Sequence, residues 1–235
     1  MLNNNLLAFI ITFAASILWL RINDFAAHRG WISSWLSRKF IHIGTGPLFV
    51  ICWVLFDSSF SSRLLAAIIP LLITVQFLLV GLGVIKDEAS VKALSRSGDR
   101  REILRGPLFY GIIFVLITLI FWTTSPIGIV ALMLMCGGDG LAEILGRLFG
   151  KRSIPWSEKK TYLGSLGMLV GGWTVSVAVL AVFVSLNVFA GPLSTYLLPI
   201  TLIAFVGMLV ETLPMKDIDN FTITIAAIIL GFIVF

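Results

Sequence analysis

The sequence PIGIVALMLMCGGDGLAEIL, residues 126–145, decides the fold of this protein. Residues 126–138 carry no charge, and Asp139 and Glu143 then follow within the same apolar run. A transmembrane helix needs about 20 predominantly apolar residues. Ionisable side chains inside such a helix are costly and are a functional hypothesis by default. The stretch therefore predicts both a membrane span and a functional site.

The composition extends this conclusion to the whole chain. Of the 235 residues, 58% are hydrophobic and 12% are charged, and the mean hydropathy is +1.04. A soluble domain of this length cannot hide so much apolar surface. We therefore predict an all-α, polytopic transmembrane bundle, with residues 1–235 in a single membrane domain of about eight spans. The predicted spans are residues 5–20, 41–57, 64–85, 107–123, 126–145, 163–186, 197–213 and 221–235.

Several classes of site are disfavoured by the residue counts. The chain has two cysteines and two histidines, so we expect neither a disulfide framework nor a zinc cluster. The N-terminal MLNNNLLAFI has no basic segment before its apolar run, and we expect that run to be a true span. We expect no nucleic-acid partner, and the pattern says nothing of the oligomeric state.

The charged residues lie mainly on one side of the predicted bundle. Lysine and arginine cluster in the first, third and fifth connections, residues 21–40, 86–106 and 146–162, whereas the opposite connections contain only Arg63. The positive-inside rule predicts that the basic side is cytoplasmic. One interpretation is that these cations only set topology and bind anionic lipid. Most acidic residues lie on the same side, however, which favours a site for an anion with a divalent metal.

Asp139, Glu143 and Arg147 follow each other at intervals of four residues, so on a helix they form one stripe. Gly146 and Gly150 lie on or near that stripe, and the GGDG sequence at 137–140 should loosen or break the helix. Two acids beside cations suit Mg²⁺ with phosphate, because Mg²⁺ takes one or two carboxylates plus phosphate oxygens. The alternative is that the acids merely pair with Arg147 for packing.

The stretch GRLFGKRS, residues 146–153, is similar to a phosphate-binding P-loop but fails its pattern. Three residues separate its glycines where four are needed, and Arg152 replaces the metal-binding hydroxyl. Phosphate binding remains the hypothesis, because Lys159 and Lys160 precede a helix expected to begin near Thr161, whose N-terminus attracts anions. We expect the later glycines, Gly164, Gly167 and Gly171, to permit close helix packing.

Two further segments carry candidate residues. On the second span Lys39, His42 and Gly46 share a helical face. Lys39 could simply extend its amine to the interface, and His42 could be a general base, a phosphate ligand or a structural residue. Near the C-terminus, Glu211 ends the seventh span, and Asp219 or Asn220 could cap the eighth.

Taken in order, RKFIHIGTG, RSGDRREILRGPLFYG, GDGLAEILGRLFG, KKTYLGSLGM and ETLPMKDIDNFTI resemble the membrane-bound polyprenol and phytol kinase family. The resemblance covers about residues 35–225 and extends distantly to phosphatidate cytidylyltransferases. It implies a kinase that uses CTP, or another nucleoside triphosphate, to phosphorylate an isoprenoid alcohol in the bilayer. It also implies a nucleotide site in the segments 138–150 and 159–165.

The resemblance carries over Asp139, Gly140, Gly146, Gly150, Lys160, Thr161, Gly164 and Ser165, and the remaining roles below are inferred from the charge pattern. Asp139 matches the central acid of the motif, and Leu163 departs from the glutamate of dolichol-kinase-like members, which favours phytol, geranylgeraniol or farnesol as substrate. Asp139 is expected to be catalytic with His42 and Lys39, the base being either His42 or Asp139. Mg²⁺ is assigned to Asp139, Glu143, Glu211 and Asp219. Nucleotide binding is assigned to Gly140, Glu143, Gly146, Arg147, Gly150, Lys159, Lys160, Thr161, Gly164 and Ser165.

Two other functions fit parts of the pattern. A cytidylyltransferase would share CTP, metal and fold but would attach CMP to a lipid phosphate. A transporter would also bury charges, but it should show repeated broken helices. The resemblance further implies an integral protein of a bacterial, cyanobacterial plasma or thylakoid membrane, or of a plastid membrane, where such kinases recycle phytol toward tocopherol.

Overall fold

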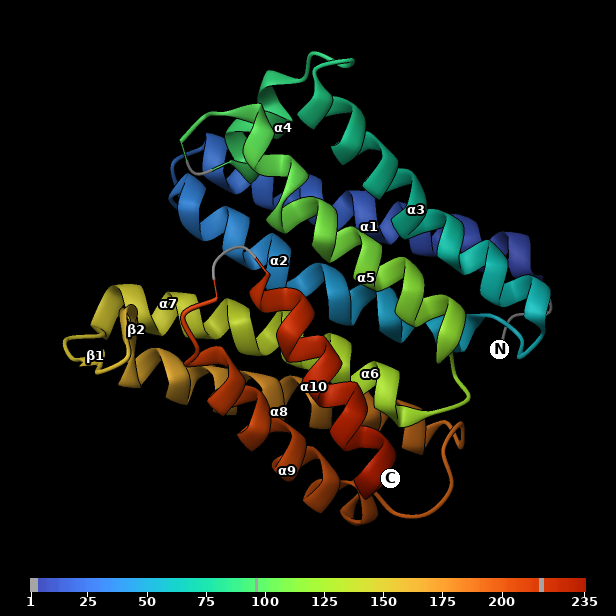
Figure 1. The fold of residues 1–235 in the computed structure, drawn as a ribbon. Coiled ribbons are helices and arrows are strands. Elements are labelled where there is room, and N and C mark those ends of the chain that lie inside the picture. The colour runs from blue at the N-terminus through green and yellow to red at the C-terminus, as the bar shows by residue number, and fades with distance from the viewer. Residues whose placement is uncertain (1–3, 96, 216–217) are drawn as a thin grey trace.

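The structure is a computed structural model that describes residues 4–95, 97–215 and 218–235. Within these ranges the chain is almost entirely helical, as Figure 1 shows. The helices are α1 (Asn5–His28), α2 (Ser34–Ile51), η1 (Cys52–Leu55), α3 (Phe60–Leu82), α4 (Glu88–Leu94), η2 (Arg100–Leu104), α5 (Gly106–Ile120), α6 (Pro126–Met133), η3 (Leu134–Gly138), α7 (Asp139–Phe149), α8 (Tyr162–Ser185), α9 (Ser194–Glu211) and α10 (Asp219–Val234). Two short strands, β1 (Ser153–Ile154) and β2 (Ser157–Thr161), complete the list.

Seven helical segments of the described chain are long and apolar enough to cross a membrane. The α6–η3–α7 segment is one of them, running from Pro126 to Phe149. α10 is also apolar but has only 16 residues, about 24 Å of helix. The predicted all-α polytopic bundle is confirmed, with seven helices long enough to span and a shorter eighth, α10, where about eight spans were predicted.

The predicted ends of the spans are wrong by several residues, because polar caps and not hydropathy fix them. α1 continues to His28, eight residues beyond its predicted end. α3 starts after Ser59, whose hydroxyl accepts from Ser62 N, and ends at Gly83, whose φ of +79° lies in the left-handed region. These are the devices by which helices ordinarily begin and end.

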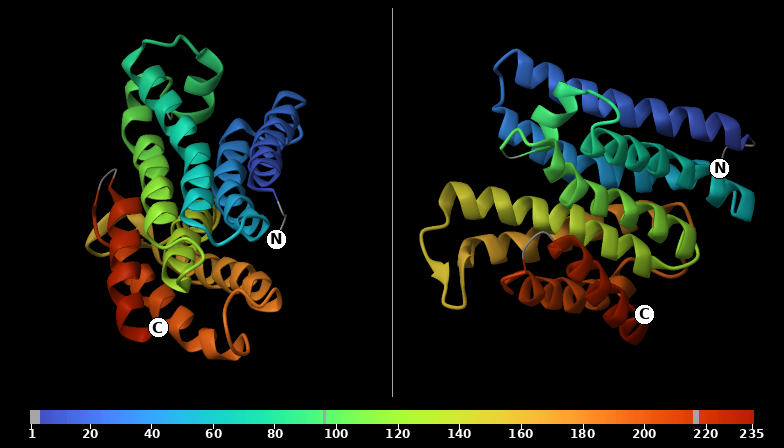
Figure 2. Two further views of the ribbon diagram at one scale, coloured as in Figure 1. Left: turned by 90° about the vertical axis from the view of Figure 1, so that its right-hand side faces the viewer. Right: turned by 45° about the horizontal axis from the view of Figure 1, so that its top comes forward.

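The connections divide between two ends of the bundle. Figure 2 shows the β1–β2 hairpin, the α1–α2 connection and the α4 region at one end, and both described termini at the other. The first end, which we call the basic end, contains the connections 21–40, 86–106 and 146–162, where lysine and arginine cluster. The one-sided arrangement of these connections matches the expected alternation of spans, and the assignment of the basic end to the cytoplasm stays a prediction.

The core is built around the α6–η3 segment. Residues from Ile127 to Gly138 are buried, and α2, α5, α8 and α10 pack around them. GGDG was expected to loosen or break the helix, and in η3 the helix loosens without breaking, into a π-helical turn in which Asp139 N–H donates to Leu134 O. Such π-turns occur often at functional sites, and this one places Asp139 at the start of α7.

The connection between α7 and α8 is a β-hairpin that the all-α expectation omits. β1 and β2 pair in antiparallel fashion, and Pro155 and Trp156 form the turn between Ile154 and Ser157. The Trp156 indole N–H donates to Thr212 Oγ1 at 3.3 Å, which ties the hairpin to the end of α9. The hairpin thereby fixes where β2 presents its lysines.

Candidate active site

α2 and α7 face each other at the basic end through a group of charged side chains. Lys39 forms an ion pair with Glu143 Oε2, and the Lys39 side chain is only 8% exposed. Glu143 Oε1 accepts from Trp35 Nε1 at 3.1 Å and lies 3.5 Å from Arg38 Nη2. Lys39 therefore does not extend to the membrane surface, but neutralises a carboxylate within the bundle.

One turn deeper, His42 of α2 meets Asp139 of α7. His42 Nε2 lies 3.4 Å from Asp139 Oδ2 and 3.3 Å from the carbonyl oxygen of Met135. The hydroxyl of Tyr110, on α5, donates to His42 O at 2.9 Å and lies 3.2 Å from Cys136 Sγ. Because a carbonyl oxygen can only accept, the arrangement favours a proton on Nε2 that is shared between Met135 O and Asp139.

A second charged group joins β2, α8, α9 and α10. Lys160 Nζ donates to Glu211 Oε1 and to Asp219 Oδ2, each at 2.8 Å. Ser165 Oγ donates to Glu211 Oε2 at 3.3 Å. Burial alone would lower the pKa of Lys160, but the two carboxylates outweigh it and raise that pKa above its ordinary value. Lys160 is therefore held as a cation.

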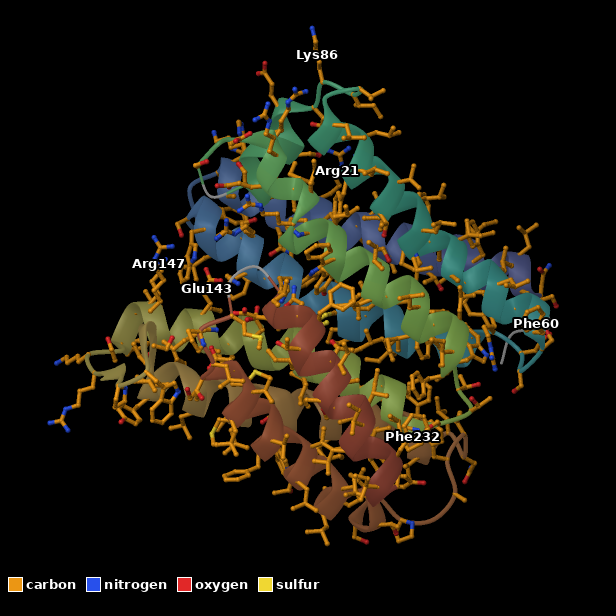
Figure 3. The ribbon with its side chains drawn as sticks, viewed as in Figure 1. Arg21, Phe60, Lys86, Glu143, Arg147 and Phe232 are labelled. Carbon is orange, nitrogen blue, oxygen red and sulfur yellow. The ribbon has the colours of Figure 1, made fainter. Side chains whose placement is uncertain are left out.

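The two charged groups lie close enough to influence each other. Asp139 interacts electrostatically with Lys160 and with Glu211. The structure thus brings Lys39, His42, Asp139 and Glu143 together on one side and Lys160, Ser165, Glu211 and Asp219 on the other, within one electrostatic environment. Figure 3 shows Glu143 and Arg147 at this end of the bundle, apart from Lys86.

The predicted glycines allow three helices to approach one another here. A side-chain carbon at Gly140 would overlap Ile43 of α2, and one at Gly167 would lie 2.9 Å from Leu141 O. At the α7–α8 contact Gly146 and Gly164 lie back to back, and the Thr161 hydroxyl caps α8 by accepting from Gly164 N at 3.1 Å. The expected packing role of Gly164 and Gly167 and the expected start of α8 are confirmed, whereas nucleotide contacts of the glycines stay a prediction.

The charged side chains of α7, Asp139, Glu143 and Arg147, do not form ion pairs with one another in the described structure. Arg147 places its guanidinium 4.6 Å from the centre of the Trp35 ring, and Glu143 pairs across to α2. The alternative that Asp139 or Glu143 pairs with Arg147 for packing is therefore wrong in this structure. On β2, Lys159 is exposed while its neighbour Lys160 turns inward, as expected for adjacent residues of a strand.

α10 starts differently from the expectation. Asp219 is its first residue and binds Lys160, and Ile218 occupies the cap position without a side-chain hydrogen bond. Neither Asp219 nor Asn220 is the N-cap. Asp219 instead pairs with Lys160 of β2, and this ion pair connects the hairpin to α10.

The four carboxylates differ in how far their oxygens are already used. Both oxygens of Glu143 and both of Glu211 have hydrogen-bond or ion-pair partners. Asp139 uses Oδ2 for His42, and Asp219 Oδ1 is buried without a hydrogen-bond partner among the described residues. In the described part of the chain no three His, Cys, Asp or Glu side chains are grouped to hold a metal by themselves. Mg²⁺ binding by these acids therefore stays a prediction, and it would need phosphate oxygens as further ligands.

Three residues of this site were absent from the predicted set. Trp35 and Arg38 precede Lys39 by one turn and one residue on α2, and both contact Glu143. Tyr110 supports His42 from α5. The helical spacing of Trp35, Lys39 and His42 was a usable signal, whereas the approach of Tyr110 depends on the order of helices in the bundle.

Comparison with known proteins identifies the family. A Triticum aestivum protein named probable phytol kinase, chloroplastic, is 38% identical over 230 residues, which cover 97% of this chain and 77% of the relative. The Arabidopsis thaliana farnesol kinase, chloroplastic, is 38% identical over 228 residues, covering 96% of this chain and 73% of the relative. This chain belongs to the phytol and farnesol kinase family.

A third relative agrees with this assignment. Phytol kinase 1, chloroplastic, of Arabidopsis thaliana is 36% identical over 209 residues, covering 88% of this chain and 69% of the relative. No family model matches the chain, and no solved structure matches it significantly. The family resemblance inferred from the five sequence motifs is thus confirmed by full-length similarity.

Proposed function

We propose that this protein is a membrane kinase that transfers a phosphoryl group from CTP to an isoprenoid alcohol such as phytol, geranylgeraniol or farnesol. Full-length similarity to proteins named phytol kinase and farnesol kinase supports the reaction class. The observation that carries the site is the Asp139–His42 pair, held between α2 and α7 beneath a group of cations. CTP as donor rests on the family resemblance of the sequence motifs.

In this proposal Asp139 accepts the proton of the alcohol. His42 Nε2 faces two acceptors, Met135 O and Asp139 Oδ2, so it donates and is not free to act as a base at that nitrogen. His42 therefore orients Asp139 and keeps Oδ2 occupied, which leaves Oδ1 toward the substrate. Of the two bases considered from the sequence, the geometry favours Asp139.

The cations around Asp139 would stabilise the charge on the phosphates. Phosphoryl transfer depends mainly on positioning and on electrostatic stabilisation. Arg147, Lys151, Arg152 and Lys159 are exposed at the basic end, where a nucleotide could reach them. Lys39 and Lys160 are engaged by carboxylates in this structure, so their role is to fix Glu143, Glu211 and Asp219, and through them the frame of the site.

The residues present fit a magnesium ion bound with the nucleotide. Asp219, whose Oδ1 is buried without a hydrogen-bond partner among the described residues, would hold it together with phosphate oxygens. Asp139 Oδ1 is needed for the alcohol proton, and Glu143 and Glu211 are already satisfied by their own partners. Mg²⁺ supplies neutralisation of the phosphate charge when it is bound. The isoprenoid chain would lie among the apolar helices, with its hydroxyl raised to the basic end.

The relatives are named chloroplastic, which favours a plastid membrane for this chain. A cyanobacterial plasma or thylakoid membrane fits the same chemistry and stays part of the proposal, with the basic end facing the nucleotide-containing compartment.

Labelled nucleotides test the reaction directly. Membranes that contain the protein are incubated with phytol or geranylgeraniol, Mg²⁺ and either γ-labelled or α-labelled CTP. A kinase attacks the γ-phosphorus, so we expect γ-label in a prenyl monophosphate and release of CDP. Membranes that contain the Asp139→Asn variant serve as the control for endogenous enzymes.

Three results would contradict the proposal in whole or in part. α-Label in a lipid, with release of pyrophosphate, would identify a cytidylyltransferase. Transfer of γ-label from ATP or UTP in place of CTP would retain the kinase and replace its donor. No transfer from any nucleotide to any of these alcohols would remove the enzyme assignment and revive the transporter interpretation.

A further inference from the structure

A hollow in the described structure lies away from Asp139. It encloses about 750 Å³ between the C-terminal turn of α3, α4 and the start of η2, at the basic end of the bundle. Figure 1 shows α4 covering this end of α3, and in Figure 3 Lys86 projects outward there, separated from Glu143 and Arg147. The hollow is therefore a second feature and not part of the site described above.

The walls of the hollow combine apolar and cationic groups. Val80, Ile85 and Val91 supply apolar surface, and Lys86, Lys92 and Arg100 supply three positive charges. Within the described ranges none of these three cations forms an ion pair. An apolar wall next to unpaired cations at a membrane surface suits an amphiphile with an anionic head.

The acidic residues of the lining are used locally. Asp87 caps α4 by accepting from Ser90 N and Ser90 Oγ, at 2.9 and 2.6 Å, and these bonds lower its pKa. Asp99 caps η2 by accepting from Arg101 N at 2.9 Å. Glu88 lies in the first turn of α4, where the helix dipole favours a carboxylate. The acids thus interact with the ends of the helices and do not form ion pairs with Lys86, Lys92 or Arg100 in the described chain.

The Arg100 guanidinium packs directly against Gly83, the residue that follows α3. A side-chain carbon at Gly83 would overlap this guanidinium, so the glycine that ends α3 also makes room for the arginine. A cation at this position interacts favourably with the negative end of the α3 dipole. The guanidinium is therefore positioned at the wall of the hollow by α3 itself.

One side chain joins the hollow to the active site. Ser95 lines the hollow, and its carbonyl oxygen accepts from Arg38 Nη1 at 3.3 Å. The other terminal nitrogen of Arg38 lies 3.5 Å from Glu143. A ligand in the hollow would thus contact Ser95, which Arg38 connects to Glu143 of α7.

We propose that the hollow between α3, α4 and η2 binds the phosphate head of a membrane lipid, with Arg100, Lys86 and Lys92 as its ligands. The chemical class is a phosphate monoester on an apolar chain. Two sources have this chemistry, phosphatidic acid of the bilayer and a prenyl monophosphate leaving the active site. The inference does not depend on the proposed kinase activity, because it concerns binding in the absence of nucleotide.

The test measures lipid binding to the full chain purified in neutral detergent, by native mass spectrometry. Dioleoylphosphatidic acid and geranylgeranyl monophosphate are the two probes, and dioleoylphosphatidylcholine is the reference. We expect Arg100→Gln to weaken binding of the phosphate monoesters about fivefold and Lys86→Gln/Lys92→Gln about twentyfold, since each cation near a membrane surface contributes similarly. The tighter of the two probes identifies the source.

Arg101→Gln is the matched control, because Arg101 is the exposed neighbour of Arg100 and does not line the hollow. It should bind like the wild type. Equal weakening by Arg100→Gln and Arg101→Gln, phosphatidylcholine binding as tight as the phosphate monoesters, or displacement of the lipid by CTP would each overturn the proposal. If Arg100→Gln does not fold, the Lys86→Gln/Lys92→Gln variant, changed only at exposed positions, provides the comparison of lipid binding with Arg101→Gln.

Discussion

The two ends of the bundle treat polar groups in different ways. At the far end, Asp57 accepts from Asn5, Ser59 and Ser62, and Arg63 donates to the carbonyl oxygen of Leu119. Each charge there is held by neutral groups. At the basic end, carboxylates and cations face one another across helices, and every ion pair that the structure describes lies there.

The kind of partner that each charged group has suggests a different role for each end of the bundle. Neutral hydrogen bonds to Asp57 are enough to tie the start of α1 to the start of α3. The basic end instead places Asp139, Glu143, Glu211 and Asp219 within one electrostatic environment and balances them with Lys39, His42 and Lys160. Charges held partly buried in this way are expensive to leave unpaired, which is expected of a site that binds charged phosphates.

The largest expected contrast between the ends is in turnover. Asp139→Asn should lower transfer of γ-label from CTP to geranylgeraniol by about 10²- to 10⁴-fold, the usual contribution of a general base. Asp57→Asn, the matched carboxylate at the far end, should retain turnover. Both variants should insert and purify in normal yield. Near-normal activity of Asp139→Asn would mean that Asp139 is structural and that the two ends do not differ in function.

Stability should separate two adjacent lysines of β2. Lys160→Met leaves Glu211 and Asp219 without their cation, and we expect the free energy of unfolding to fall by about 3–5 kcal/mol. Lys159→Met, at the exposed neighbouring position, should change it by less than about 0.5 kcal/mol. Thermal unfolding in detergent measures both. Equal effects would show that the Lys160 cluster is not a stabilising feature.

The raised pKa of Lys160 also predicts how its contribution to stability depends on pH. Because the folded-state pKa is raised, the contribution is complete below the ordinary lysine pKa of about 10.4 and is lost only as pH rises through the folded value. The difference between wild type and Lys160→Met should therefore stay constant from about pH 6 to pH 9. A difference that declines within this window would contradict the pairing.

Close helix packing at the basic end gives a smaller effect. A methyl group at Gly171 would overlap the carbonyl oxygen of Gly137 in η3, whereas one at Gly172 would lie 3.2 Å from the nearest side-chain atom, on Leu134. Gly171→Ala should destabilise by about 1–3 kcal/mol, as overpacking does, and should lower turnover by displacing Asp139. Gly172→Ala should be milder. The reverse order would show that α8 does not set the position of η3.

The smallest effect is expected at the far end. Hydrogen bonds from Ser59, Ser62 and Asn5 lower the pKa of Asp57, so its contribution is present above the ordinary aspartate pKa of about 3.9 and is lost as pH falls below it. The unfolding midpoints of wild type and Asp57→Asn should differ slightly at neutral pH, begin to approach each other below about pH 4, and converge only as pH falls through the lowered folded-state pKa of Asp57. A difference that grows on acidification would reverse this assignment.

Local spacing predicted part of this structure well. The apolar runs predicted the helices, and the intervals between Asp139, Glu143 and Arg147 placed them on α7. The partners could not be predicted in the same way, because Lys39 and Glu143, or Lys160 and Asp219, are far apart in the sequence and meet only through the order of helices. Arg147, which was assigned to nucleotide binding, stacks on Trp35, and the alternative that it pairs with the acids of α7 is wrong. Of the two expected outcomes at GGDG, the helix loosens at Leu134–Gly138 and does not break, because the buried backbone keeps its hydrogen bonds.

The central claim is that nucleotide binds at the basic end against residues 138–165. Hydrogen–deuterium exchange of the full chain in detergent, with and without CTP and Mg²⁺, tests it without relying on turnover. The account predicts slower exchange in peptides that cover α7, the β1–β2 hairpin and the start of α8, and no change in residues 52–64 at the far end or 83–100 around the hollow. Protection confined to either of those segments, or none in 138–165, would contradict it.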